Sequence, residues 1–383
     1  MKSMEVFLEL AIILVIAKIF GYLSVRLGFP AALGQLLGGV IIGPSLLDVV
    51  EYGSEVRLLS ELGVVMLLFL AGLETDVEEF KHVGLSAFIV AVMGVFVPFL
   101  LGYLVSVLHG YGSLKALFFG GVLTATSVGL TTSILMDMKK LRTKVGTTIL
   151  AAAIVDDVLG IVILTLLVAM SSRGKVEVED IEIILLEVAI FFILGILIGH
   201  PLVKEVLTLS ERITLPETVT TFAIVIMLIF AYLAEKFQLA GITGAYLAGL
   251  LVSMTEGSRK ITDKIMTIGY SLFIPIFLVS IGIETDIRVL THAGVFALVY
   301  SLIAVVGKII GCGFGALVAR FKPIEAIQVG IGMIPRMEVA LIIANVGLKE
   351  GILTRGDLAV PVTMVVITTL ITPFLLKWAF SKG

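Results

Sequence analysis

Two adjacent aspartates, Asp156 and Asp157, lie in the middle of the apolar run AAAIVDDVLGIVIL, within a stretch near 144–170 that is long enough to span a membrane. A carboxylate at the centre of a membrane helix costs about 3 kcal/mol, so an ionisable pair there indicates a functional site. Successive helical residues point about 100° apart, so one carboxylate can face a cation cavity while the other meets a basic partner. Carboxylate oxygens suit hard cations and protons. The pair therefore predicts proton or cation handling; an ion pair that only fixes helix packing is the alternative.

Lys308 is the natural counter-ion for these carboxylates. It lies near the centre of the apolar stretch 293–319 and far from either end, which disfavours the alternative of a lysine that snorkels to the membrane surface. A buried lysine can itself release a proton. The glycines around it allow close helix packing, and they are Gly307, Gly311, Gly313 and Gly315.

Hydroxyl groups and a proline occupy the same depth in two further stretches. Thr126 and Ser127 lie near the centre of 114–137, in the segment TATSVGLTTS, and Pro335 lies near the centre of 325–348. Proline removes one helical hydrogen bond and frees a carbonyl oxygen, so the two segments can present helix ends and carbonyl oxygens to an ion. Hydroxyls bonded to the preceding turn and an ordinary proline kink are the alternatives.

Arg336 follows this proline and never loses its charge, so it is unsuited to carry a proton. We expect it to have a structural role, in an ion pair with Glu338, Glu74 or Asp156.

The composition identifies the class of protein. Of 383 residues 59% are hydrophobic and only 15% are charged, with a mean hydropathy of +1.16, which is more apolar surface than a soluble chain of this length can bury. The chain is therefore predicted to be a polytopic membrane protein in a lipid bilayer. The sequence contains no basic patch with interleaved aromatic residues, so nucleic-acid binding is not expected. It also contains no phosphate-binding GxxxxGK[ST] loop, so nucleotide binding is not expected. The single cysteine, Cys312, excludes an internal disulfide.

Apolar stretches long enough to cross the bilayer number about thirteen. They lie near 5–25, 30–49, 57–74, 84–108, 114–137, 144–170, 183–203, 216–235, 238–254, 263–283, 293–319, 325–348 and 357–379. Lysine and arginine are more frequent in alternate loops, among them KKLRTK at 139–144. The positive-inside rule then predicts a cell-membrane protein with its N-terminus outside and its C-terminus in the cytoplasm.

An internal repeat recurs at a constant offset of 210 residues. LAGLETDVEEFKHVG at 70–84 matches SIGIETDIRVLTHAG at 280–294. The offset shifts the pattern by seven spans, and an odd shift reverses orientation, as in secondary transporters with inverted repeats. One transmembrane domain over 1–383 is therefore predicted, with repeat one at about 5–170, a connector helix at about 183–203 and repeat two at about 216–380. Glycines also match at this offset: Gly34 with Gly244, Gly39 with Gly249, Gly72 with Gly282, and Gly120 with Gly330.

Taken together, the inverted repeats, the IVDD motif, the mid-span lysine and the paired segments TATSVG and GMIPRMEVAL resemble the monovalent cation/proton antiporters. The resemblance covers essentially the whole chain and is to the bacterial and archaeal sodium/proton exchangers of the electrogenic Asp-Asp type. It implies that the fifth and twelfth spans are unwound and cross at mid-membrane, near Thr126 and Pro335. It also implies that Asp157 is the main ligand for Na⁺ and for the proton, and that Asp156 pairs with Lys308.

The same resemblance implies a homodimer formed through a scaffold domain, against which a core domain moves like an elevator. Arg336 and Glu74 resemble a structural ion pair of the electroneutral branch, whereas the Asp-Asp pair with lysine resembles the branch that moves two protons per sodium.

The predicted function is secondary antiport of sodium, or lithium, against protons, in which cation and proton compete for Asp157. No enzyme activity and no cofactor are expected, and the transported species are Na⁺, Li⁺ or K⁺ and H⁺. Potassium/proton exchange on the same scaffold is one alternative. An ion-coupled symporter on a similar fold is another, although an anionic substrate would require a basic centre in place of two aspartates.

Overall fold

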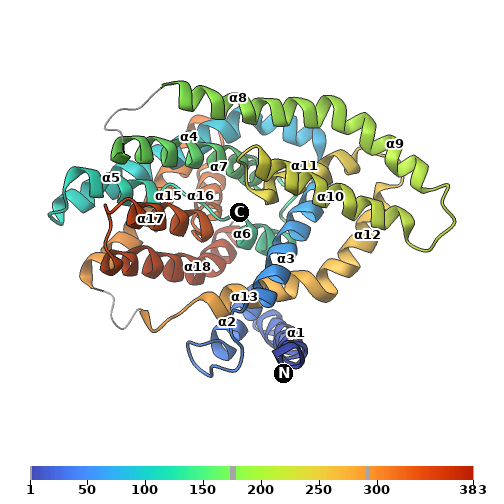
Figure 1. Cartoon of the computed structure of the whole chain (residues 1–383), viewed down its shortest axis with the longest axis horizontal. Coiled ribbons are helices and arrows are strands. Elements are labelled where there is room, and N and C mark those ends of the chain that lie inside the picture. Colours follow the sequence, from blue (N-terminus) through green and yellow to red (C-terminus); the bar gives the residue numbers. More distant parts are fainter. Residues whose placement is uncertain (1, 173–177, 290–293, 383) are drawn as a thin grey trace. The chain divides into compact units, whose positions relative to one another are not determined.

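The computed structural model describes residues 2–172, 178–289 and 294–382, and the regular structure within these ranges is helical throughout (Figure 1). In the same ranges, nine helical segments are long and apolar enough to cross a membrane. Each predicted apolar stretch corresponds to one helix or to one series of helices, which confirms the all-helical polytopic fold. The second and ninth stretches form the short helices α2 (Ala31–Ile42) and α11 (Gly241–Ser253).

The polypeptide folds into two compact units that alternate along the chain. Unit 1 comprises Met1–Glu79, Leu135–Arg142 and Ile184–Glu284, and unit 2 comprises Phe80–Ile134, Thr143–Ile183 and Thr285–Gly383. The sequence does not predict this interleaving, because the length of an apolar run does not specify which other run it packs against.

Unit 1 contains the helices at the start and in the middle of the chain. They are α1 (Lys2–Arg26), α2, α3 (Ser54–Glu74), most of α8 (Val178–Leu194), α9 (His200–Ser210), α10 (Thr218–Lys236), α11, α12 (Ser258–Ile268) and α13 (Ile274–Glu284). Two single π-helical turns, η1 (Gly195–Gly199) and η2 (Gly269–Phe273), join α8 to α9 and α12 to α13.

Glycines bring two pairs of helices in unit 1 into close contact. A Cβ placed on Gly39 of α2 would lie 2.9 Å from the Cα of Gly282 in α13. A Cβ placed on Gly249 of α11 would lie 3.0 Å from the Cα of Gly72 in α3. Both distances are too short for a side chain, so each pair of helices packs backbone against backbone. The two contacts are related by the 210-residue offset.

Unit 2 contains the helices that carry or flank the predicted ion-binding residues. They are α4 (Val77–Leu108), α5 (Ser113–Val122), α6 (Val128–Asp137) up to Ile134, α7 (Lys144–Ser172), α15 (Val295–Val318), α16 (Pro323–Gly332), α17 (Glu338–Lys349), η3 (Arg355–Leu358) and α18 (Ala359–Phe380).

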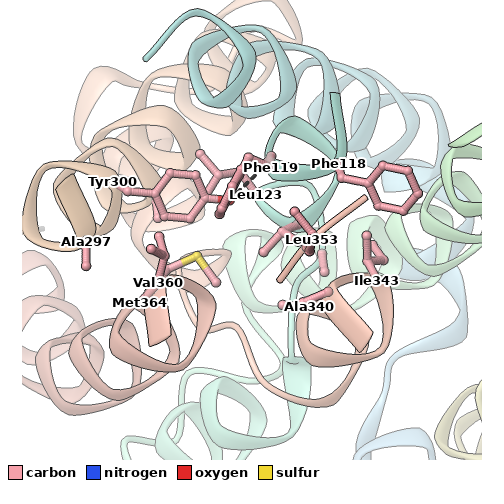
Figure 2. Packing of buried hydrophobic residues seen from close by; sticks show 14 of the residues in the cluster. Phe118, Phe119, Leu123, Ala297, Tyr300, Ala340, Ile343, Leu353, Val360 and Met364 are labelled. Atoms are coloured by element: carbon pink, nitrogen blue, oxygen red, sulfur yellow. Dashed lines mark hydrogen bonds between the residues drawn. The ribbon is translucent and has the colours of Figure 1, made fainter. Parts of the chain in front are cut away.

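A buried cluster holds several of these helices together, and Figure 2 shows its packing. Phe118 and Phe119 of α5, Tyr300 of α15 and Met364 of α18 are fully buried in it. The Tyr300 hydroxyl donates a hydrogen bond of 2.5 Å to the carbonyl oxygen of Phe119, which satisfies a polar group inside this apolar core.

Two of the predicted spans are interrupted. The first break is at residues 123–127, between α5 and α6, and the second break is at residues 333–337, between α16 and α17. The expected unwinding of the fifth and twelfth spans is thereby confirmed. Backbone groups in both breaks lose helical partners, so they need other partners inside the protein.

Candidate ion-binding site

Asp156 on α7 and Lys308 on α15 form a buried ion pair. The Lys308 Nζ lies 2.9 Å from the Asp156 Oδ1, and the two side chains are 0% and 1% exposed, respectively. An isolated charge at this position would be strongly unfavourable, and each group offsets the burial cost of the other. The interior therefore holds one negative and one positive charge whose sum is zero.

The glycines of α15 make room for this pair. Gly307 packs next to Pro98 of α4, and a Cβ on Gly311 would press against the backbone of Met93. On the facing helix, a Cβ on Gly94 would come within 3.7 Å of the Lys308 Nζ. Small residues on both helices thus give the lysine side chain space beside α4, in line with the packing expected of a glycine-rich span.

Asp157 follows directly on α7 and is half-buried. Because neighbouring residues of a helix point about 100° apart, its carboxylate faces a different environment from that of Asp156. The two aspartates thus differ in their surroundings: the Asp156 side chain is buried in an ion pair, and Asp157 is partly exposed.

The two breaks are hydrogen-bonded to each other. The Ser127 N–H donates to the carbonyl oxygen of Pro335 at 2.8 Å, and the Thr126 hydroxyl lies 3.5 Å from the carbonyl oxygen of Met333. These bonds hold the two interrupted helices together at their unwound residues and give the hydrogen-bonding groups of the breaks partners within the protein. Both predicted hydroxyl residues are buried at this crossing.

Arg336 lies in the second break with its guanidinium fully buried. Its Nη2 donates to the carbonyl oxygen of Leu123 at 2.9 Å, and its Nη1 donates to those of Ile334 and, at 3.5 Å, Met333. Leu123 and Met333 are the C-terminal caps of α5 and α16, and they are 210 residues apart. One guanidinium thus occupies the negative ends of both half-helices, where a cation is stabilised by the helix dipoles.

Glu74 and Glu338 are the two glutamates predicted as ion-pair partners of Arg336. Glu74, the last residue of α3, lies 3.9 Å from the Arg142 guanidinium in unit 1. The side chain of Glu338 lies outside the described part of the structure. A structural ion pair of Arg336 with either glutamate stays a prediction, while the observed partners of Arg336 are carbonyl oxygens.

Sequence reasoning did not single out three polar groups near the breaks. The Thr131 hydroxyl donates to the Gly332 carbonyl oxygen at 2.7 Å, the Thr368 Oγ1 accepts from the Arg336 N–H at 3.4 Å, and the Tyr300 hydroxyl lies in the neighbouring core. The signal for Thr131 is its place in the hydroxyl-rich segment 124–133. Hydrogen bonds to backbone groups of this kind are not predictable from the residue types alone.

The donors available to a cation near the crossing follow from these contacts. The C-terminal carbonyl oxygens of both half-helices already accept from Arg336, so they are less available than the freed carbonyls expected of a proline break. Within the described ranges, no group of three or more His, Cys, Asp or Glu side chains is arranged to hold a metal ion. Thr126 and Ser127 are buried at the crossing, and their participation with Asp157 in a site for a hard monovalent cation stays a prediction.

Comparison with known proteins gives one consistent family. Residues 11–382 match the family model described as the transmembrane sodium/hydrogen exchanger. The Na(+)/H(+)-K(+) antiporter GerN of Bacillus cereus is 39% identical, over 98% of this chain and 97% of that protein. The Na(+)/H(+) antiporter of Enterococcus hirae is 34% identical over 97% of each chain. The solved structure of the sodium proton antiporter MjNhaP1 from Methanocaldococcus jannaschii has the same fold, with a TM-score of 0.70 at 18% identity, over 99% of this chain and 98% of that one.

Proposed function

The chain belongs to the sodium/hydrogen exchanger family, and from this premise we propose that it exchanges sodium or lithium ions for protons across the cell membrane. The observation that carries the proposal is the buried Asp156–Lys308 pair, with a second, half-buried carboxylate at the next position of α7. Two adjacent carboxylates and a lysine can supply both a cation ligand and exchangeable protons, and a purely structural ion pair does not require the second carboxylate.

In the proposed cycle, Asp157 binds either a cation or a proton, and alternating access carries whichever is bound. The Asp156–Lys308 pair supplies a second proton, so two protons move against one sodium ion and one net charge crosses per turnover. The membrane potential then drives exchange with about 2.3 kcal/mol per charge per 100 mV.

We propose that two inverted repeats, at about 5–170 and 216–380 with a connector helix at 183–203, form the single transporter domain. The glycine contacts between α2 and α13 and between α3 and α11 support this arrangement, because they occur at positions 210 residues apart. The N-terminus is proposed to lie outside and the C-terminus in the cytoplasm. A homodimer is proposed as the working assembly. The cycle uses no cofactor and no enzymatic step.

Potassium is the second candidate cation. One relative that covers almost the whole chain is named a Na(+)/H(+)-K(+) antiporter, so potassium belongs in the same measurement as sodium and lithium.

The test is proton movement in proteoliposomes that contain a pH-sensitive dye, with Na⁺, Li⁺ or K⁺ added in turn and the potential either clamped or free. We expect cation-dependent proton flux that responds to the potential. Asp157→Asn should abolish it, because the ligand shared by both ions loses its charge. Asp263→Asn, which neutralises an exposed aspartate of α12, is the matched control and should retain full activity. Normal exchange by Asp157→Asn would refute the proposed mechanism.

A further inference from the structure

Unit 1 contains a pocket of about 560 Å³. Its lining residues come from the end of α9, the start of α10, the start of α12 and the loops that adjoin these helix ends. Figure 1 labels the three helices. Each of these helix ends is also the end of a candidate membrane span, so the pocket lies at a boundary between bilayer and water. Its volume is within the range of about 300–1,000 Å³ that is usual for small-ligand sites. None of its residues takes part in the proposed exchange cycle.

The lining of the pocket combines both signs of charge with apolar side chains. Its charged members are Glu211, Glu217, Glu256, Lys260 and Lys264. Its apolar members are Leu207, Ile213, Leu215, Val219 and Ile261. A lining of this mixed kind suits a ligand that is itself both charged and apolar.

Two of the charged residues are partners of each other. The Lys264 Nζ lies 2.6 Å from the Glu217 Oε1, and the Thr220 hydroxyl donates to the Glu217 Oε2 at 3.0 Å. The hydrogen bond from Lys264, followed by that from Thr220, lowers the pKa of Glu217. This pair is a satisfied part of the wall, and the other three charged groups remain for a ligand.

Those three groups line the same pocket and carry charges of both signs. The Glu211 carboxylate approaches Gly257, since a Cβ placed on that glycine would lie 4.0 Å from the Glu211 Oε1. Glu256 is adjacent to this glycine, and Lys260 lies in the first turn of α12. All three side chains are exposed, and none of them makes an ion pair with another residue in the described part of the chain. Two carboxylates and one ammonium are thus available within one pocket.

Apolar side chains are exposed on the same loop. Ile213 is 43% exposed and Leu215 is 69% exposed, at the level where α9 leaves and α10 enters the membrane. Exposed branched side chains at this depth contact acyl chains more favourably than water. The occupant should therefore have a zwitterionic head next to an apolar body.

We propose that this pocket binds the headgroup of a phospholipid that carries a primary ammonium and a phosphate, such as phosphatidylethanolamine. The ammonium donates to Glu211 and Glu256, the phosphate accepts from Lys260, and the acyl chains lie along Ile213 and Leu215. A purely anionic headgroup would leave both carboxylates facing negative charge. A quaternary ammonium has no N–H group with which to donate a hydrogen bond to them.

The test is native mass spectrometry of the full-length, detergent-purified protein with equimolar ethanolamine, glycerol and choline phospholipids that share the same acyl chains. We expect the ethanolamine lipid to be retained roughly tenfold more than either competitor, the size of one charge-assisted hydrogen bond. Glu211→Gln/Glu256→Gln should reduce this preference to within about twofold, and Lys260→Gln should weaken retention of the ethanolamine lipid. The matched controls Asp263→Asn and Arg259→Gln alter exposed charges of the same helix outside the pocket and should keep the preference.

Four outcomes would overturn the proposal. Equal retention of choline and ethanolamine lipids would exclude recognition of the primary ammonium, and preferred retention of the glycerol lipid would make the pocket an anion site. An unchanged preference in the double glutamine variant would place the lipid elsewhere. Soluble phosphoethanolamine, added as a competitor, should displace the lipid poorly; equal competition would mean that the site takes a soluble zwitterion. Lipid retention is measured without ion exchange, so it is independent of the proposed transport function.

Discussion

Replacing Lys308 by glutamine tests the buried pair most directly. The substitution removes the ammonium that lies 2.9 Å from Asp156 and leaves a 1%-exposed carboxylate without that partner. Breaking a buried pair from one side costs about 3–5 kcal/mol, because the remaining charge is no longer compensated. In Asp156→Asn/Lys308→Gln two neutral amides of similar size replace the pair, so the double variant should lose less stability than the sum of the two single variants. We expect a coupling energy of about 1–3 kcal/mol from the complete cycle.

The same substitution should change how exchange responds to voltage. If the Asp156–Lys308 pair carries the second proton, its loss removes one net charge per turnover. At about −100 mV that charge is worth about 2.3 kcal/mol, which corresponds to a roughly 50-fold difference in the sodium gradient that exchange can sustain. Lys308→Gln should lose this voltage-dependent factor and keep exchange that is driven by pH alone.

The assay compares proteoliposomes with wild-type protein, the two single variants and the double variant. The sodium gradient at which net flux stops is measured with the potential clamped at zero and at about −100 mV. Thermal unfolding of the same four proteins gives the stability cycle. Lys18→Gln is the matched control, since Lys18 also lies in a membrane-spanning helix but is exposed and donates to the Tyr270 carbonyl oxygen. A Lys308→Gln protein with unchanged voltage dependence would remove the pair from the proton pathway, and one with unchanged stability would refute the energetic argument.

Three further outcomes are expected from unfolding measurements. Gly249→Ala should cost about 1–3 kcal/mol, because the added methyl group meets the backbone of α3. Gly84→Ala should cost nothing, because its added Cβ would lie in open space. Arg336→Ala should lower the free energy of unfolding by about 3 kcal/mol or more, since the charged donor to the Leu123 and Met333 carbonyls is lost. Arg336→Lys should restore only part of the lost stability. A fully stable Arg336→Ala protein would contradict the capping role. The pKa of Glu217 is lowered in the fold, so its pair with Lys264 stabilises the protein above the ordinary glutamate pKa of about 4.3 and loses this effect as pH falls through the lowered value. The difference in stability between Glu217→Gln and wild type should therefore be largest near about pH 7 and shrink as the pH falls below about 4.3; a difference that does not shrink in acid would contradict this assignment.

Much of the fold follows from the sequence because the bilayer imposes a simple rule on length and polarity. The apolar stretches specify the helices, and their short members become α2 and α11. The second break is indicated by Pro335, which cannot continue the hydrogen-bond ladder of a helix. The first break, at 123–127, contains no proline, and its prediction rests on the repeat and the resemblance.

The remaining features depend on backbone partners, which residue types do not specify. The expected partner of Arg336 is a carboxylate, since charge pairs are the usual way to bury a guanidinium. The observed partners are main-chain oxygens that become available only when both helices end at the same point. For the same reason, the sequence does not reveal that Asp137, at the end of α6, accepts a hydrogen bond of 2.9 Å from the Ala32 N–H at the start of α2.

Two glycine contacts recur at the 210-residue offset of the predicted repeat, whereas the charged residues of the candidate site do not recur at that offset. At an offset of 210 residues, Asp156 corresponds to Val366, Lys308 to Pro98 and Arg336 to Thr126. The half-helices α5 and α16 each bring a C-terminal end to the crossing, and each end carries about half a negative charge, so the single positive charge of Arg336 balances both. A second arginine at position 126 would leave about one uncompensated positive charge beside the proposed cation ligand. In the proposed cycle, the charges that change during exchange are therefore those of Asp156, Asp157 and Lys308, which the repeat does not duplicate.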